Sequence, residues 1–85
     1  MSNLSRAQIQ EKVLAVISEV LTVDKSEINV DASIPDDLAA NSMDKVELIL
    51  TIEDEFGGSI PEEDIENIVT VGDIIDYVEN NLNAA

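Results

Sequence analysis

The chain has 85 residues without cysteine or histidine, and 19 acidic residues against four basic ones give it a formal net charge of −15. Without cysteine there is no disulfide framework or thiolate metal site, and without histidine the commonest general base and metal ligand is missing, so an intrinsic enzyme is not expected. The acidity excludes nucleic acid as a partner, because that binding depends on Lys and Arg, and it favours a basic protein surface.

Hydrophobic residues make up 45% of the chain and recur in periodic segments, which favours a packed core over disorder. The length suits one small domain, so we expect residues 1–85 to form a single-domain monomer. The N-terminal residues lack the apolar run of a signal peptide, and no run is long enough to span a bilayer. Insertion into a membrane is therefore not expected.

The first predicted helix covers residues 5–21. Ser5 and Gln8 have the spacing of a capping box, in which two side chains satisfy free backbone N–H groups at a helix start. An apolar stripe follows at spacings of three and four residues, as one buried helix face requires. Its members are Ile9, Val13, Val16, Ile17 and Val20.

Residues 22–41 show no sustained period and are rich in turn formers, so we expect a long loop pinned by its own apolar residues. A calcium loop counted from Asp24 is excluded, because Asn29 would take the position that requires glycine and Pro35 that of the bidentate glutamate. The residues expected to pin the loop are Ile28, Val30, Ile34 and Leu38.

The second predicted helix covers residues 42–56 and ends at Gly57 and Gly58. Helical periodicity places an acidic stripe opposite a core stripe. The acidic stripe contains Asp44, Glu47, Thr51 and Asp54, with Met43 and Leu50 beside it, and the core stripe contains Val46, Ile49, Ile52 and Phe56. Lys45 is a misfit within the apolar arc.

Ser42 stands where the long loop gives way to this helix. One interpretation is that it caps the helix, since a serine oxygen accepts a hydrogen bond from a first-turn N–H group. The other is that it carries a phosphate-linked group, which the helix dipole and the free N–H groups favour. These residues alone leave both interpretations open.

Two further helices are expected in the last third of the chain. A short third helix covers residues 61–68, where Pro61 and the following acids suit a helix start. The fourth covers residues 73–81, after a capping signal at Thr70 and Asp73. Its buried stripe contains Ile74, Ile75, Val78 and Leu82. The fold class is therefore all-α: an antiparallel four-helix bundle with three main helices, one short third helix and a long loop between the first two.

Several motifs stand in the order and spacing of one known family. They are Asp37-Leu38, Ser42-Met43-Asp44, Val46-Glu47-Leu48, Glu53-Asp54-Glu55-Phe56, Ile60-Pro61, Thr70-Val71 and Ile75-Asp76-Tyr77-Val78. On these motifs the chain resembles the acyl carrier proteins of fatty acid and polyketide synthesis over nearly its whole length. It departs from the family at two positions, where Asn41 replaces a usual aspartate and Ala39 a usual glycine.

The resemblance implies that Ser42 carries 4'-phosphopantetheine, transferred from coenzyme A by a separate phosphopantetheinyl transferase, the holo-carrier synthase. The thiol of this arm would hold acyl intermediates as thioesters, and the chain would shuttle them between enzymes of fatty acid, lipid or polyketide synthesis without catalysing a step. The implied location is the bacterial cytoplasm, or an organelle stroma or matrix if a transit peptide has been removed.

The resemblance also implies that the second helix docks on basic patches of acyl-transferring and condensing enzymes. The residues implied in this contact are Met43, Asp44, Glu47, Leu50, Glu53, Asp54, Ile60, Ile65 and Glu66. Two alternatives stay open. One is a carrier of aminoacyl or peptidyl groups, including D-alanyl groups, and the other is an unmodified acidic interaction domain in which Ser42 is only a cap.

Overall fold

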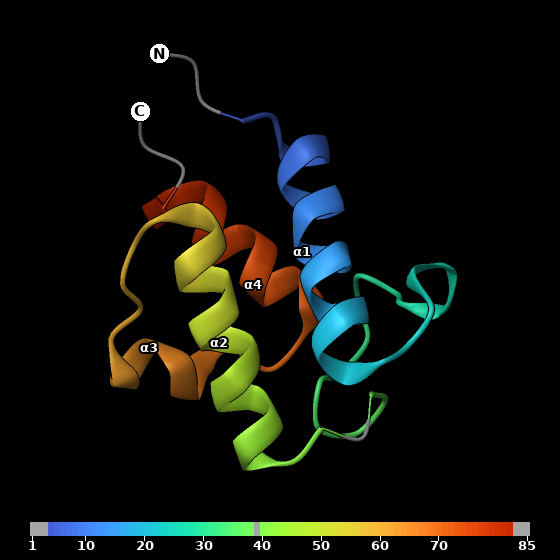
Figure 1. The fold of residues 1–85 in the computed structure, drawn as a ribbon. Helices are drawn as coiled ribbons and strands as arrows, with labels where there is room; N and C mark the ends of the chain where they lie inside the picture. The colour runs from blue at the N-terminus through green and yellow to red at the C-terminus, as the bar shows by residue number, and fades with distance from the viewer. Residues whose placement is uncertain (1–3, 39, 83–85) are drawn as a thin grey trace.

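The computed structural model describes residues 4–38 and 40–82, which form an all-α fold (Figure 1). The elements in chain order are α1 (Arg6–Leu21), the 3₁₀ turn η1 (Lys25–Glu27), α2 (Ser42–Phe56), α3 (Glu62–Asn67), α4 (Val71–Tyr77) and the π-helical turn η2 (Val78–Leu82). These residues contain no strand, only an isolated bridge between Ser33 and Thr70. The predicted fold class, with three main helices, one short helix and a long first loop, is confirmed.

The helix ends follow the capping residues. Helix α1 begins after Ser5, whose Oγ accepts a hydrogen bond from the Gln8 N–H at 3.2 Å, while the Gln8 side chain accepts one from the Ser5 N–H at 2.8 Å. Helix α4 begins at Val71, earlier than the predicted 73, because Thr70 is its N-cap. The Thr70 side chain accepts a hydrogen bond from the Asp73 N–H at 3.1 Å.

The core lies between α1, α2 and α4. In Figure 1, α1 and α2 run in opposite directions and α4 crosses behind them, while the short α3 lies to one side of α2. The core is aliphatic, and the two aromatic residues, Phe56 and Tyr77, are only partly buried against it. Its fully buried larger side chains are Ile9, Val13, Ile17, Ile34, Leu48, Ile49, Ile52, Val71, Ile74, Ile75 and Val78.

One predicted core position on α2 is wrong. Val46 is 52% exposed, whereas Leu48, which the predicted core stripe omitted, is completely buried. The buried face of α2 is therefore centred nearer to Leu48 and Ile52, toward α1 and α4. Val46 points to the side of α3, and this six-residue helix is too short to cover that side of α2.

The long loop is tied to the connection between α3 and α4. The Ile34 N–H donates to the Val69 carbonyl at 2.8 Å, and the Gly72 N–H donates to the Val30 carbonyl at 2.8 Å. A side chain on Gly72 would come within 3.3 Å of that carbonyl, so the glycine permits the close approach. Ile34 and Ile28 are also buried, and the loop is pinned by its apolar residues as predicted.

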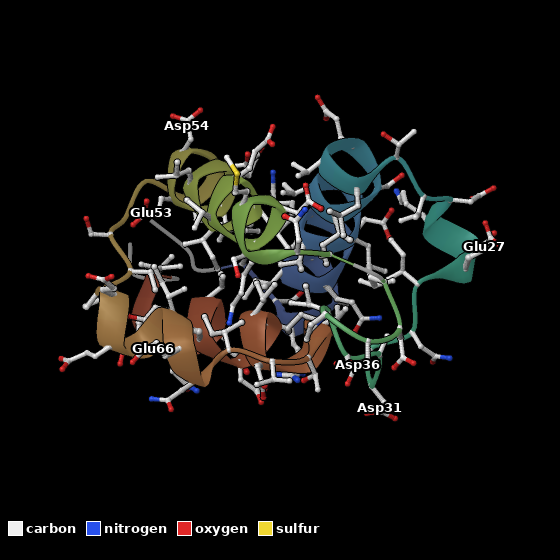
Figure 2. All side chains as sticks on the ribbon, turned by 90° about the horizontal axis from the view of Figure 1, so that it is seen from below. Glu27, Asp31, Asp36, Glu53, Asp54 and Glu66 are labelled. Atoms are coloured by element: carbon white, nitrogen blue, oxygen red, sulfur yellow. The ribbon has the colours of Figure 1, made fainter. Side chains whose placement is uncertain are left out.

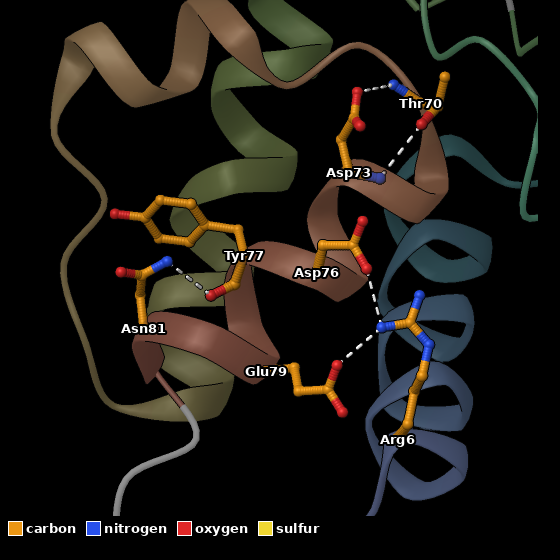
Figure 3. A network of polar contacts seen from close by, with 7 residues as sticks. All are labelled: Arg6, Thr70, Asp73, Asp76, Tyr77, Glu79 and Asn81. Carbon is orange, nitrogen blue, oxygen red and sulfur yellow. Dashed lines mark hydrogen bonds and ion pairs between the residues drawn. The ribbon is translucent and has the colours of Figure 1, made fainter.

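Polar contacts at the surface join α4 to its neighbours. The Arg6 guanidinium on α1 lies 2.8 Å from carboxylate oxygens of both Asp76 and Glu79 (Figure 3), and these hydrogen bonds raise the pKa of Arg6. The Tyr77 hydroxyl donates to Asp64 on α3 at 2.8 Å. Partial burial and this hydrogen bond raise the pKa of Tyr77. Among the described residues, no helix has the length and apolarity that a membrane crossing requires.

Candidate functional site

Asn41, rather than Ser42, caps α2. Its side-chain oxygen accepts a hydrogen bond from the Asp44 N–H at 2.9 Å, and the Asp44 carboxylate accepts one from the Asn41 N–H at 3.3 Å. This reciprocal pair is a capping box, which satisfies two backbone donors at the helix start. Ser42 is consequently the first residue of the helix itself, and the interpretation that Ser42 is the cap is wrong.

The Ser42 side chain is exposed, and its hydroxyl makes no hydrogen bond with the part of the chain that the structure describes. The N–H groups of Ser42 and Met43 open the helix, so they have no acceptor in a preceding helical turn. The helix dipole adds a partial positive charge at the same end. A free hydroxyl beside such donors suits a covalently attached phosphate group.

A groove of about 550 Å³ leads from Ser42 along α2 to α3. Apolar side chains form most of its surface, and three glutamates also line it. The lining residues are Ser42, Lys45, Val46, Ile49, Leu50, Glu53, Ile60, Glu62, Ile65 and Glu66. The structure therefore brings Leu50, Glu53, Ile60, Ile65 and Glu66, all predicted contact residues, to one groove next to Ser42.

The other predicted contact residues lie on the outer side of α2. Met43 is 81% exposed, and Glu47 and Asp54 are exposed carboxylates that make no ion pair within the described residues. Figure 2 shows Asp54 projecting outward from α2. Asp44 differs from them because it is half-buried and its carboxylate is engaged with the Asn41 N–H.

Glu53 and Ile60 have structural contacts that the sequence patterns did not reveal. Glu53 is half-buried, and its carboxylate accepts a hydrogen bond from the Ile60 N–H at 2.6 Å. The Ile60 side chain is itself buried. This bond closes the loop between α2 and α3, and no local pattern signals it because the two residues stand seven positions apart.

Lys45 faces the groove from the first turn of α2 and is half-buried. Its charge acts on Asp73 at the start of α4. The hydrogen bond from the Thr70 N–H is the main cause that lowers the pKa of Asp73, and the Val69 N–H and the positive charge of Lys45 lower it further. The sequence patterns left Lys45 as a misfit within the apolar arc. Its position three residues after Ser42 is the signal that could have placed it beside that serine, since residues three apart on a helix are neighbours.

Comparison with known proteins agrees with this geometry. Residues 11–78 match the family model described as the phosphopantetheine attachment site. The acyl carrier protein of Thermotoga maritima is 46% identical over 78 residues, which cover 92% of this chain and 96% of that protein. The acyl carrier protein of Thermosynechococcus vestitus is 41% identical over 81 residues, which cover 95% of this chain and 100% of that protein. The acyl carrier protein of Porphyromonas gingivalis is 43% identical over 76 residues, which cover 89% of this chain and 97% of that protein.

The fold, the free serine and the family match define a phosphopantetheine attachment domain. The chain belongs to the acyl carrier protein family. It is a non-catalytic carrier that holds acyl groups on a 4'-phosphopantetheine arm, as predicted, and it works with a phosphopantetheinyl transferase and with enzymes of fatty acid synthesis. The aminoacyl carrier and the unmodified interaction domain find no support. Ala39, one of the two departures from the family pattern, lies outside the described residues.

Proposed function

We propose that Ser42 is the residue to which the arm is attached, and that α2 and α3 form the surface that partner enzymes recognise. One observation carries the first part of this proposal. Asn41 occupies the capping position, which leaves the Ser42 hydroxyl exposed and without a hydrogen bond in the described chain. A serine engaged as the cap would have its oxygen occupied by a hydrogen bond from a backbone N–H group.

The residues of the chain have distinct roles in this attachment. The Ser42 oxygen forms the new bond to phosphorus and gives up its proton to the transferase, and the 3',5'-ADP part of coenzyme A leaves. The opening N–H groups and the dipole of α2 favour the negative charge that results. When bound, the arm supplies a thiol that holds the acyl group as a thioester. The apolar groove beside Ser42 suits the hydrocarbon part of that group.

The attachment is tested by intact-mass measurement after incubation with coenzyme A and a transferase of broad specificity. The wild-type chain should gain the mass of one phosphopantetheine group, and Ser42→Ala should gain none. Ser59→Ala is the matched control, because Ser59 is also exposed and lies in the loop after α2, and it should be modified like the wild type. An adduct that persists in Ser42→Ala would overturn the assignment.

The proposed docking surface combines exposed carboxylates with exposed apolar side chains. Glu47 and Asp54 supply the charge, and Met43, Val46 and Leu50 are 81%, 52% and 58% exposed beside them. Such a surface fits basic patches on the transferase and on acyl-transferring and condensing enzymes. Steering by opposite charges gives fast and salt-sensitive association, which a carrier that visits successive enzymes needs. The bacterial relatives support a proposed location in the bacterial cytoplasm.

The docking proposal is tested by measuring the affinity for a condensing enzyme at increasing salt. Affinity should fall as salt rises and should fall further for Glu47→Lys at low salt. Glu19→Lys makes the same charge change at an exposed position of α1, so it is the matched control and should bind nearly as the wild type does. Binding that is independent of salt, or equal losses for the two variants, would contradict the proposal.

A further inference from the structure

Within the described residues, Lys45 is the one basic side chain without an ion pair. Arg6 pairs with Asp76 and Glu79, Lys12 with Glu55, and Lys25 with Glu11. The chain carries a net charge of −15, so carboxylates are abundant. A partly buried lysine whose ammonium group forms no ion pair with a carboxylate in such a chain is therefore a feature that needs a reason.

Two acids close to Lys45, Asp73 at the start of α4 and its chain neighbour Asp44, are engaged with backbone donors. Glu62 and Glu66 line the groove with Lys45 but form no ion pair with it. The Asp73 carboxylate accepts hydrogen bonds from the N–H groups of Val69 and Thr70, each at 2.9 Å (Figure 3 shows the contact with Thr70). The Asp44 carboxylate accepts one from the Asn41 N–H. Both acids are thus held by helix caps, and the Lys45 charge acts on Asp73 without forming an ion pair.

The position of Lys45 brings it close to the modified serine. It follows Ser42 by three residues on α2, a spacing that places two side chains next to each other on one helix face. Long side chains in a helix lean toward its N-terminus, which here is the turn that contains Ser42. Both residues also line the same groove. A negative group on the Ser42 oxygen would therefore arise within reach of the Lys45 ammonium.

We propose that Lys45 is the counter-ion of the phosphodiester that attachment of the arm creates on Ser42. This inference rests on the proposed attachment at Ser42. The phosphodiester adds one negative charge to a chain that already repels itself, at a helix end where Asp44 is also negative. Lys45 offsets this added charge and holds the root of the arm over the mouth of the groove. It is a positioning residue and takes no part in the transfer of acyl groups.

The test compares the melting temperatures of the unmodified and modified forms of each variant at low salt. In the wild type, modification should leave the melting temperature unchanged or raise it. In Lys45→Met, the change in melting temperature caused by modification should be about 1 to 5 °C more negative than in the wild type. This range follows from the typical strength of an exposed ion pair and the size of the domain. Lys45→Arg keeps the charge and should behave like the wild type.

Lys12→Met is the matched control. It removes the same charge from a residue that pairs with Glu55, at the opposite end of α2 from Ser42. It should lower both melting temperatures equally and leave the effect of modification as in the wild type. Equal modification effects in Lys45→Met and Lys12→Met would overturn the proposal. If Lys45→Met does not fold, Lys45→Gln serves for the same comparison.

Phosphorus-31 NMR of the modified chain gives a second readout. The phosphodiester resonance should be broader in the wild type than in Lys45→Met at low salt, and high salt should remove the difference. Identical resonances at low salt would overturn the proposal. Mass spectrometry of the same samples separates the two proposals: a chain without an adduct on Ser42 contradicts the attachment itself, whereas an adduct without coupling to Lys45 contradicts only the counter-ion.

Discussion

The Asn41 amide separates two tasks that both belong to the start of α2. One is to satisfy the first backbone donors of the helix, and the other, under the proposed attachment at Ser42, is to present a hydroxyl for modification. Asn41 performs the first through its bond to the Asp44 N–H, and Ser42 is left for the second. Asparagine and aspartate are about equally good N-caps, so the departure from the aspartate usual in the family preserves the division of tasks.

Replacement of the cap should destabilise the helix start. Asn41→Ala loses the acceptor for the Asp44 N–H, and we expect the free energy of unfolding to fall by about 1 kcal/mol. Asn41→Asp keeps an acceptor and should stay within about 0.5 kcal/mol of the wild type. Urea denaturation measures both values. An Asn41→Ala variant as stable as the wild type would show that the capping bond contributes nothing in solution.

Asp73 should give the stability of the chain a dependence on pH. The hydrogen bond from Thr70 is the main cause that lowers the pKa of Asp73 in the folded state, so its ionised form stabilises the fold. This contribution is fully present above the pKa that Asp73 has in the unfolded chain, and it is lost as the pH falls through the lower pKa that Asp73 has in the folded chain. The wild type should therefore exceed Asp73→Asn in unfolding free energy at pH 7, and the difference should shrink below about pH 4. If the difference in unfolding free energy between the wild type and Asp73→Asn stayed constant from pH 7 to below about pH 4, the ionised Asp73 carboxylate would not be its cause.

At the scale of the element, α2 has three faces with different tasks. Leu48, Ile49 and Ile52 form the buried face. Val46 and Leu50 line the groove toward α3 while remaining largely exposed. The third face carries the exposed carboxylates. A helix with only a core side and a solvent side would have buried Val46, and the groove exists because α3 covers the second side only in part.

Two truncations on α2 should therefore have very different costs. Leu48→Ala leaves a cavity in the packed core, and we expect it to lower the free energy of unfolding by about 2 to 5 kcal/mol. Val46→Ala removes a similar kind of side chain from an exposed position and should change it by no more than about 0.5 kcal/mol. Chemical denaturation measures the free energy of unfolding of both variants. If Val46→Ala lost more of it than Leu48→Ala, the assignment of Leu48 to the core and of Val46 to the exposed side of α2 would be wrong.

For the whole molecule, a high negative charge coexists with a well-packed fold. The radius of gyration is 11.8 Å, close to the roughly 12 Å typical of a compact domain of this length. The ion pairs of the described residues are exposed, so each contributes little to stability. The aliphatic core must therefore hold the helices together against the repulsion between carboxylates.

Added salt should stabilise the unmodified chain. Screening weakens the repulsion between carboxylates in the folded state and affects the aliphatic core far less, so the melting temperature should rise between low and physiological ionic strength. Calorimetry at matched pH measures the shift, with sodium chloride chosen because it is not strongly excluded from protein surfaces as sulfate is. A melting temperature that does not change with ionic strength would show that self-repulsion is not a significant cost.

The sequence by itself determined the helices and the family. Caps at Ser5 and Thr70 and the apolar periods are local signals, since they depend on residues within one or two turns. The ordered motifs indicated the family, and the match of residues 11–78 to the family model of the phosphopantetheine attachment site confirms it. Only the tertiary structure decided that Val46 is exposed and Leu48 buried, that Glu53 binds the Ile60 N–H, and that Lys45 has no ion pair in the described chain. These outcomes depend on how α3 and α4 cover α2, because burial and pairing are properties of neighbours that are distant in the sequence.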